Sequence, residues 1–188
     1  MDIHVTKTEL EGVVLIGTDF FRDERGFFIE VFHKGAYAAA GLPTEFVQDN
    51  HSKSARKVLR GFHYQDMTAP MGKPVRCTAG AILDVAVDLR VGSPTFGKWV
   101  GVELTAENMR QIWVPDGFGH AFMTLSESAE VQYKCTGLYT PPSEGTVSWN
   151  DPEIGVQWPF SDPVLSARDQ NGMSLQQYLQ SPAFRYGG

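Results

Sequence analysis

Cysteine is scarce in this chain, and long apolar segments are absent. Cys77 and Cys135 are the only cysteines among 188 residues, too few for a disulfide framework and too far apart for a paired metal motif. No apolar run approaches the roughly 20 residues that a membrane-spanning helix needs, and the N-terminus lacks the apolar core of a signal peptide. We therefore expect the protein to reside in the cytoplasm.

A surplus of basic residues is also missing. The formal net charge is −6, so no basic stripe is available to neutralise the phosphates of a nucleic acid. A small phosphate-bearing ligand is compatible with this charge, because it needs only a few placed Arg and Lys side chains. The hydrophobic content of 42% and the charged content of 20% are those of an ordinary globular protein. The length predicts one domain spanning residues 1–188 with a substantial core.

Amphipathic helical periodicity is nearly absent. Short helices are expected only at residues 33–41, ending at Gly41 before Pro43, and at residues 174–179. Short alternating or apolar stretches, separated by turns with Gly and Pro, fill most of the rest. This pattern predicts an all-β barrel or double-sheet sandwich, and a jelly roll fits it best. Strands are expected at 13–17, 27–32, 58–65, 75–78, 81–89, 99–104, 111–114, 121–125 and 130–136.

Two polar stretches interrupt this pattern. Residues 46–54 are rich in Asn and Ser and are interpreted as a turn, in which His51 is expected to be exposed and without a catalytic role. In the strand at 81–89, alternation places Asp84 and Asp88 on the same face as Ala86. This face is therefore expected to be partly polar, at a barrel mouth or at a sheet edge.

The strand at residues 58–65 carries the first candidate for chemistry, His63. A lone histidine in a strand is more often structural than catalytic, but Arg60 and Lys73 stand nearby in the sequence. Two cations near an imidazole suggest a site for an anionic substrate or for a developing negative charge. The imidazole pKa of about 6.5 suits proton transfer near neutrality. Strict alternation would place the side chains on two faces: Leu59, Gly61, His63 and Gln65 on one, and Val58, Arg60, Phe62 and Tyr64 on the other.

A metal site of the kind found in many small β-barrels is only half present. Residues 115–120 supply a Pro-x-Gly-x-x-His turn, ending at His120, but the expected His-x-His pair has Gln65 as its second member. A transition-metal site usually needs three or four nitrogen, sulfur or carboxylate ligands. We therefore expect no metal site, which leaves His63 and His120 for proton chemistry or hydrogen bonding.

Seven separated blocks of the sequence resemble dTDP-4-dehydrorhamnose 3,5-epimerases. They occur in the same order as in that family and extend from about residue 3 to 170, which makes them far more specific than a single motif. The blocks are Asp-Glu-Arg-Gly-Phe-Phe at 23–28, Phe-Val-Gln-Asp-Asn-His-Ser-Lys-Ser at 46–54, Val-Leu-Arg-Gly-Phe-His-Tyr-Gln at 58–65, residues 84–90 with 93–97, residues 115–120, Tyr-Lys at 133–134 and Trp-Asn-Asp-Pro at 149–152.

The resemblance implies a homodimeric, cupin-type jelly roll with a few short helices, which uses neither a metal nor an organic cofactor. The implied reaction inverts C3 and C5 of dTDP-4-keto-6-deoxy-D-glucose, a dTDP-4-keto-6-deoxyhexose, to give dTDP-4-dehydro-L-rhamnose. The C4 ketone acidifies the C3 and C5 protons, and reprotonation of an enolate on the opposite face inverts each centre. By resemblance, His63 would be the base and Asp169 its dyad partner. Lys73 would stabilise the enolate oxygen, and Tyr133 would donate a proton from the opposite face.

The resemblance also implies contacts for each part of the nucleotide sugar. Tyr139 would stack on thymine, and Arg25 and Glu30 would reach the nucleoside from across the dimer interface. The residues implied for the diphosphate or sugar oxygens are Arg60, His120 and Arg168. Those implied for the nucleotide side are Gln48 and Asn50, with Glu144 nearby.

Several positions depart from the family pattern, and they bear on the exact sugar and on the number of centres inverted. One alternative is a mono-epimerase of a dTDP-deoxysugar pathway that inverts only C3 or only C5. Another is a catalytically silent cupin that binds a nucleotide sugar. The presence of the whole quartet of His63, Lys73, Tyr133 and Asp169 favours an enzyme. The departures are Pro74 for Leu, Ala81 for Glu, Leu138 for Tyr, Arg168 for Lys, and the order Gly119-His120-Ala121.

Overall fold

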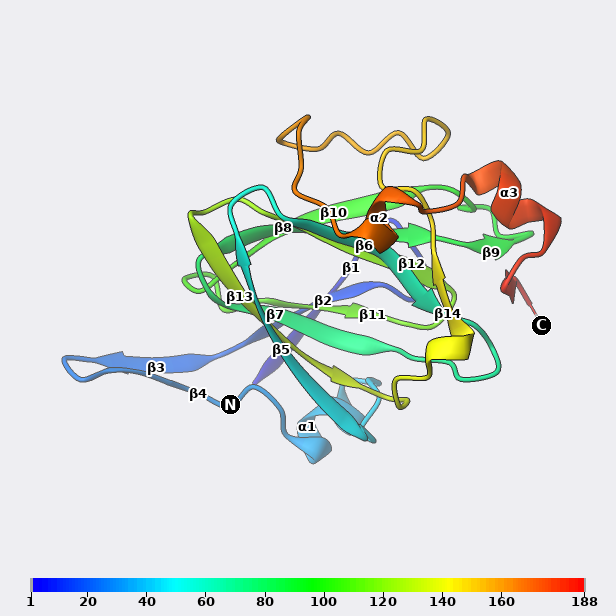
Figure 1. Cartoon of the computed structure of the whole chain (residues 1–188). Helices are drawn as coiled ribbons and strands as arrows, with labels where there is room; N and C mark the ends of the chain where they lie inside the picture. Colours follow the sequence, from blue (N-terminus) through cyan, green and yellow to red (C-terminus); the bar gives the residue numbers. More distant parts are fainter. Residues whose placement is uncertain (1, 188) are drawn as a thin grey trace.

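A computed structural model describes residues 2–187 and consists mainly of two antiparallel sheets that face each other (Figure 1). The six-stranded sheet has the order β1 (Ile3–Lys7), β2 (Val14–Thr18), β11 (Gln111–Val114), β7 (Lys73–Ala79), β13 (Ser128–Cys135) and β5 (Gln48–Ala55). The five-stranded sheet has the order β10 (Trp99–Thr105), β8 (Ala81–Asp88), β12 (Phe118–Thr124), β6 (Leu59–Gln65) and β14 (Glu144–Thr146). The prediction of an all-β jelly roll is confirmed.

Short elements surround the two sheets. A two-stranded hairpin of β3 (Phe20–Asp23) and β4 (Gly26–Ile29) projects from the body of the molecule (Figure 1). The two predicted helices are confirmed as α1 (Lys34–Ala39) and α3 (Leu175–Gln180). No helix among residues 2–187 is both long enough and apolar enough to span a membrane. The other short elements are β9 (Arg90–Val91), β15 (Phe184–Arg185), η1 (Pro141–Ser143) and α2 (Ala167–Gln170).

The hydrophobic core has three parts, namely one on each face of the five-stranded sheet and a third between α1 and strands β2 and β11. Residues of both sheets, such as Val75 and Phe122, pack together between them. On the other face, Val85 and Val87 pack against residues of the C-terminal segment such as Tyr178. Figure 1 shows α2 and α3 over this outer face. A sheet that is covered on both faces holds its strands firmly, and it supplies the rigid wall on which His63 stands.

The two carboxylates of β8 lie inside the protein and not at a sheet edge. β8 is flanked by β10 and β12, so the sheet-edge alternative is wrong. Asp84 and Asp88 are both fully buried. Asp88 accepts hydrogen bonds from Arg90, Ser93 and Thr95, which satisfies a charge that would otherwise be costly to bury.

The prediction of a turn at residues 46–54 is wrong, because β5 occupies most of this stretch and pairs with β13 along its length. Its composition is polar on both faces for two different reasons. Gln48, Asn50 and Ser52 point inward and line a cavity, whereas Asp49 and His51 are exposed to solvent. A strand between a polar cavity and water lacks the apolar alternation by which strands are found in a sequence.

Arg60 and His63 lie on the same face of β6, contrary to the alternation expected from the sequence. His63 pairs with His120 of β12, whereas Arg60 pairs with Phe122. His63 and Arg60 are three residues apart on β6, whereas their partners His120 and Phe122 are two residues apart on β12. β6 therefore carries one extra residue at this point, which is a β-bulge. The extra residue reverses the alternation, and the Arg60 side chain turns toward β5, where its Nε donates a hydrogen bond to Ser54 Oγ at 3.1 Å.

Candidate active site

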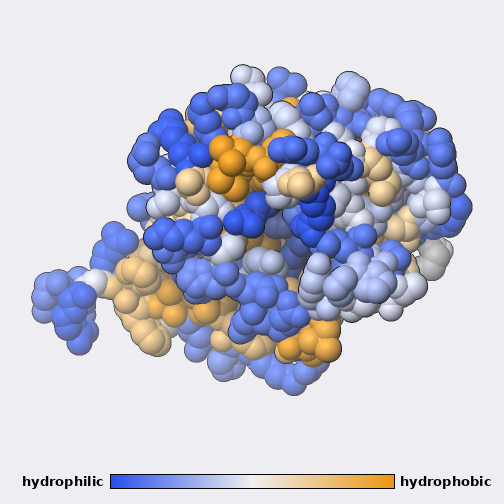
Figure 2. Space-filling model, in the orientation of Figure 1, coloured by the Kyte–Doolittle hydropathy of each residue, from blue (hydrophilic) through white to orange (hydrophobic). Residues whose placement is uncertain are grey.

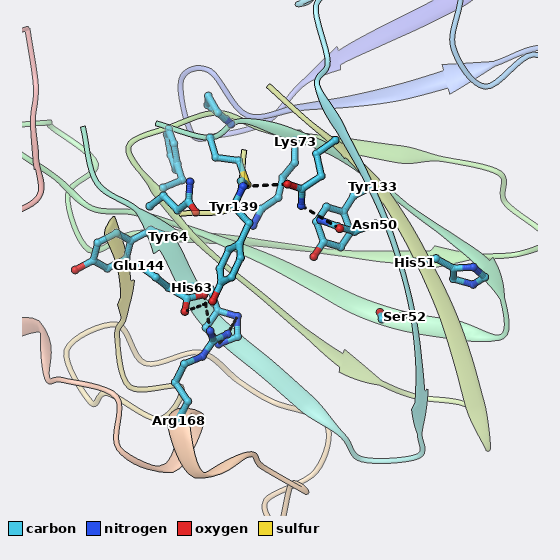
Figure 3. Close-up of a pocket in the computed structure, with 15 residues that line it drawn as sticks. Asn50, His51, Ser52, His63, Tyr64, Lys73, Tyr133, Tyr139, Glu144 and Arg168 are labelled. Atoms are coloured by element: carbon cyan, nitrogen blue, oxygen red, sulfur yellow. Dashed lines mark hydrogen bonds and ion pairs between the residues drawn. The ribbon is translucent and has the colours of Figure 1, made fainter. Parts of the chain in front are cut away.

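A cavity of about 380 Å³ opens between β5, β6, β7, β13 and β14. Most of the residues that the sequence nominated line it, and Figure 3 shows them converging from separate strands and loops. These residues are His63, Lys73, Tyr133, Gln48, Asn50, Tyr139, Glu144 and Arg168. Segments far apart in the sequence therefore form one site.

One wall of the cavity is built by β5 and β13. Tyr133 and Asn50 lie opposite each other in this ladder. Gln48 Nε2 donates a hydrogen bond to Asn50 Oδ1 at 3.1 Å. The Oε1 atom of Gln48 accepts a hydrogen bond of 2.9 Å from the backbone N–H of Tyr139. The amide side chains thereby tie the Tyr139 loop to the strand.

The half-buried His63, which lines the cavity, forms a dyad with the buried Asp169. His63 Nε2 lies 2.5 Å from Asp169 Oδ1. Asp169 is held in turn by Ser166 Oγ at 2.6 Å and by the backbone N–H of Gly61 at 3.2 Å. Burial alone would raise the pKa of Asp169, but the hydrogen bonds from His63 and Ser166 outweigh it and lower the pKa to about 2. Asp169 is therefore a fixed anion behind the imidazole.

The His63 imidazole itself is held in the neutral form more strongly than an exposed histidine. Burial is the main cause that lowers its pKa, and the positive charges of Arg168 and Lys73 act in the same direction. Asp169 opposes them. Because Asp169 engages Nε2, the Nδ1 atom is the ring nitrogen left for a substrate. A neutral imidazole can accept a proton on this nitrogen, which faces the cavity and has the Nη2 atom of Arg168 at 2.8 Å.

Lys73 and Tyr133 complete the cavity wall next to the dyad. The Lys73 ammonium lies 5.8 Å from the centroid of the Tyr133 ring. Burial lowers the pKa of Lys73 and raises the pKa of Tyr133. Lys73 lines the cavity even though Pro74 follows it. The site thus offers a base, a cation and a phenol around one space.

His120 lies behind this wall and belongs to a second dyad. Its Nε2 is 2.9 Å from Asp84 Oδ2, and it is 7% exposed. Burial lowers the pKa of His120, against the opposing effect of Asp84. His120 does not itself line the cavity. Sequence reasoning missed the role of Asp84, although the inward alternation along β8 carried the signal.

Arg25 and Glu30 stand apart from the cavity of their own chain. Arg25 is exposed at the tip of the β3–β4 hairpin and forms an ion pair with Asp23. Glu30 follows β4 directly. Neither residue is among those that line the cavity. The cavity as formed by one chain is therefore lined by neither of these two nominated contacts, and Arg60 and His120 do not line it either.

Further lining residues were not nominated from the sequence, although several of them stand in blocks that resemble the family. Gln65 is held by the backbone: its Nε2 donates to the carbonyl oxygens of Ala69 and Leu138, and its Oε1 accepts from the N–H of Thr140. It therefore joins two loops at the cavity mouth. In the described part of the chain, no three His, Cys, Asp or Glu side chains gather as a metal site. The other residues missed are His51, Ser52, Tyr64, Met71, Pro115 and Phe118.

The chain is similar to a group of nucleotide-sugar epimerases throughout its length. The sequence profile of the dTDP-4-dehydrorhamnose 3,5-epimerase family matches residues 7–177. A dTDP-4-dehydrorhamnose 3,5-epimerase of Salmonella typhimurium is 52% identical over 177 residues, which cover 93% of this chain and 97% of the relative. A dTDP-4-dehydrorhamnose 3-epimerase of Streptomyces niveus is 41% identical over 167 residues, covering 88% of this chain and 81% of the relative.

The similarity extends to the tertiary structure. The crystal structure of a dTDP-6-deoxy-D-glucose-3,5-epimerase from Legionella pneumophila, in complex with dTDP-4-keto-L-rhamnose, superimposes with a TM-score of 0.94 at 42% sequence identity. The superposition covers 99% of this chain and 100% of that one. Sequence, fold and cavity agree, and the chain belongs to the dTDP-4-dehydrorhamnose 3,5-epimerase family.

Proposed function

We propose that this protein inverts both C3 and C5 of dTDP-4-keto-6-deoxy-D-glucose, without a cofactor, to give dTDP-4-dehydro-L-rhamnose. One observation carries the proposal: the His63–Asp169 dyad opens into the same cavity as Lys73 and Tyr133. This arrangement places a base, a cation and a proton donor around one sugar ring.

The first step is removal of a proton next to the C4 ketone. His63 takes the proton on Nδ1, and the Asp169 carboxylate on Nε2 stabilises the imidazolium that forms. The electron pair of the C–H bond moves onto the ketone oxygen as an enolate. Lys73 is the cation that stabilises this oxygen, an electrostatic contribution that is usually the largest in such reactions.

The second step returns a proton to the opposite face of the same carbon. Tyr133 comes from β13, whereas His63 comes from β6 in the other sheet. A ring held between the two sheets has one of its faces toward each of them. Tyr133 is a weak acid, but a phenol is sufficient to protonate an enolate carbon when it is held close.

The other cavity residues, together with Arg60 on the same face of β6 as His63, bind the nucleotide diphosphate in this proposal. Tyr139 stacks on the thymine, and its side chain is half exposed at the cavity mouth. The amides of Gln48 and Asn50 face the nucleoside from β5. Arg60 and Arg168 supply positive charge for the diphosphate, and guanidinium groups suit phosphate oxygens well.

A homodimer, located in the cytoplasm, is part of the proposal. The β3–β4 hairpin exposes four phenylalanines, among which Phe21 is 70% and Phe28 66% exposed. Figure 2 shows this hairpin as an apolar surface with a hydrophilic tip. Exposed apolar patches of this kind mark interaction sites. A second copy that covers the phenylalanines would bring Arg25 and Glu30 to the cavity of its partner.

A mono-epimerase is the second candidate. The relative from Streptomyces niveus bears the name of a 3-epimerase and is 41% identical to this chain. The position of Tyr133 is the feature that separates the two activities in our proposal, since a donor that reaches only one carbon permits only one inversion. A silent binding protein is disfavoured because it would not need the dyad, the lysine and the tyrosine in one cavity.

Proton NMR of dTDP-4-keto-6-deoxyglucose incubated with the protein in deuterium oxide tests the proposal. Deuterium at both C3 and C5, with an L-sugar formed after a 4-ketoreductase is added, is the expected result. Label at one carbon alone would identify a mono-epimerase. Absence of label at both carbons, under conditions in which dTDP binds, would contradict any epimerase activity on this substrate.

A further inference from the structure

Two consecutive residues of the short helix α2 contact the same imidazole from different directions. Asp169 lies behind His63 and binds Nε2 at 2.5 Å. Arg168 lies on the cavity side, with Nη2 at 2.8 Å from Nδ1 and 2.7 Å from Nε2 of the same ring. The two ring nitrogens point in divergent directions, so one donor cannot be in line with both. The guanidinium therefore lies against the ring and covers it.

This position of Arg168 is incompatible with proton abstraction. A base must come within about 2.6–3.2 Å of the atom that carries the proton it removes. The Nη2 atom already occupies that distance from Nδ1. The guanidinium covers the side of the imidazole that faces the cavity, where the sugar ring has to lie for its carbon to reach Nδ1, so Arg168 has to move before His63 can act.

Other contacts show what holds Arg168 in place. Its Nη1 forms an ion pair with Glu144 Oε1. The second carboxylate oxygen of Glu144 accepts a hydrogen bond of 3.1 Å from the Tyr139 hydroxyl. Figure 3 shows these three side chains gathered over His63. These contacts connect Tyr139, the ring that we expect to stack on thymine, through Glu144 and Arg168 to the imidazole of His63.

The two helix residues differ in their freedom to move. The Asp169 side chain is 3% exposed and is fixed by Ser166 and Gly61. The Arg168 side chain is 43% exposed, so it can rotate without opening the core. A diphosphate carries two negative charges and accepts paired hydrogen bonds from a guanidinium, which makes it a stronger partner than the single carboxylate of Glu144.

We propose that Arg168 is a positioning residue that covers the His63 imidazole until the diphosphate of the bound substrate draws the guanidinium away and uncovers the base. The inference rests on the proposed function, because it takes the diphosphate of a dTDP-sugar as the partner. It adds a coupling between nucleotide binding and the availability of the base.

The charges around His63 give this movement an electrostatic consequence. The groups that face it are Asp169 and Arg168 on α2, Lys73 on β7 and Glu144 on β14, with His120 opposite on β12. Arg168 is one of the positive charges that lower the pKa of His63. When it leaves, the pKa of His63 rises and the imidazole becomes a stronger base. The substrate thus strengthens the base as it uncovers it.

The test is an NMR titration of the ¹⁵N-labelled His63 imidazole in the full chain, with and without saturating dTDP as the probe. In the wild type, dTDP should raise the pKa of His63 by about one pH unit. In Arg168→Gln, the pKa without dTDP should already be raised, and dTDP should add less than about half of the wild-type shift. Arg56→Gln is the matched control, because Arg56 pairs with Glu127 at the surface and does not line the cavity. It should leave the titration without dTDP unchanged.

A kinetic measurement gives an independent readout. The acid limb of kcat/KM reports the base in the free enzyme, and the acid limb of kcat reports it in the complex. In the wild type, the acid limb of the kcat profile should lie at higher pH than the acid limb of the kcat/KM profile. In Arg168→Gln, the difference in pH between these two limbs should become smaller. A merely structural role for Arg168 would lower the rate without changing this separation.

Equal shifts of His63 upon dTDP binding in the wild type and in Arg168→Gln would overturn the inference, because the diphosphate would then act only through its own charge. If this occurred while the wild type exchanged deuterium at C3 and C5, the proposed function would stand and the coupling alone would fail. Failure of dTDP to bind at all, measured by calorimetry, would overturn both.

Discussion

His63 and His120 face each other directly across the β6–β12 ladder, and each imidazole is bonded to its own buried carboxylate. The His63–Asp169 dyad opens into the cavity, whereas His120 and Asp84 are enclosed in the wall behind it. Two similar pairs therefore differ in one respect, namely access to a substrate. This difference supports our proposal that His63, and not His120, abstracts the proton.

His63→Ala should abolish deuterium incorporation at C3 and at C5, because the one other histidine among the described residues that line the cavity, His51, is exposed and bonded to Glu130. Binding of dTDP should change little, since the contacts that we propose for the nucleotide do not include the imidazole of His63. NMR exchange and calorimetry measure the two effects separately. Exchange at the wild-type rate in this variant would show that His63 is not the base.

Tyr133→Phe should preserve exchange of the substrate protons and impair inversion at C5, because abstraction by His63 does not need the phenol. Deuterium from the solvent would then be added to the same face of the carbon from which the proton was removed. The position and the stereochemistry of the label, read by NMR, check this expectation. Equal loss of inversion and of exchange at both carbons would contradict the role of Tyr133 as a single proton donor.

The alkaline limb of the pH profile should belong to Lys73. Burial lowers the pKa of Lys73 below its usual value of about 10.4, and only the protonated amine stabilises an enolate. Activity should therefore decline as the pH rises through this lowered pKa. Burial raises the pKa of Tyr133, so its own deprotonation falls at higher pH.

Two variants separate the charge of Lys73 from its shape. Lys73→Met should lower kcat by about 10²–10³-fold. Lys73→Arg should keep a charge at this position and move the alkaline limb of kcat/KM to higher pH. An unchanged limb in Lys73→Arg would mean that another group titrates there.

Asp169→Asn should destabilise the protein at neutral pH, and the effect should disappear in acid. The pKa of Asp169 is about 2 in the folded protein and about 3.9 in an unfolded chain. The carboxylate therefore contributes about 2 kcal/mol of stability above pH 4, which is lost as the pH falls from about 4 to about 2. Urea unfolding of both proteins over this range measures the difference.

Asp49→Asn is the matched control for this measurement. Asp49 is 69% exposed and pairs with Lys134 at the surface, so its removal should cost less than about 1 kcal/mol. A constant difference between the wild type and Asp169→Asn across the pH range would show that the ionised carboxylate does not contribute to stability.

Replacing Phe21 and Phe28 together by Ser should produce a monomer, because these two rings are opposite each other in the hairpin and strongly exposed. Analytical ultracentrifugation measures the change in mass. Arg25→Ala should leave the dimer intact and weaken dTDP binding. A stable dimer in the double Phe variant would place the interface elsewhere.

The sequence alone determined the class of fold and the identity of the catalytic candidates. Short apolar stretches between Gly and Pro turns are sufficient to indicate an all-β protein, because a strand needs only a few residues to show its period. His63, Lys73, Tyr133 and Asp169 were identified because they stand in blocks whose order resembles one family. The periodicity of a strand involves only neighbouring residues, and the order of the blocks is a property of the linear chain. Both can therefore be found in the sequence without the tertiary structure.

Other features depended on contacts between distant segments. β5 was hidden by its polar composition, which is explained only by the cavity on one side and solvent on the other. The bulge in β6 brought Arg60 to the face of His63, against simple alternation. The covering of His63 by Arg168 joins residues 105 positions apart in the chain. Local patterns fix which elements form, but the register between strands and the packing of the C-terminal segment decide which side chains meet, and these depend on the whole tertiary structure.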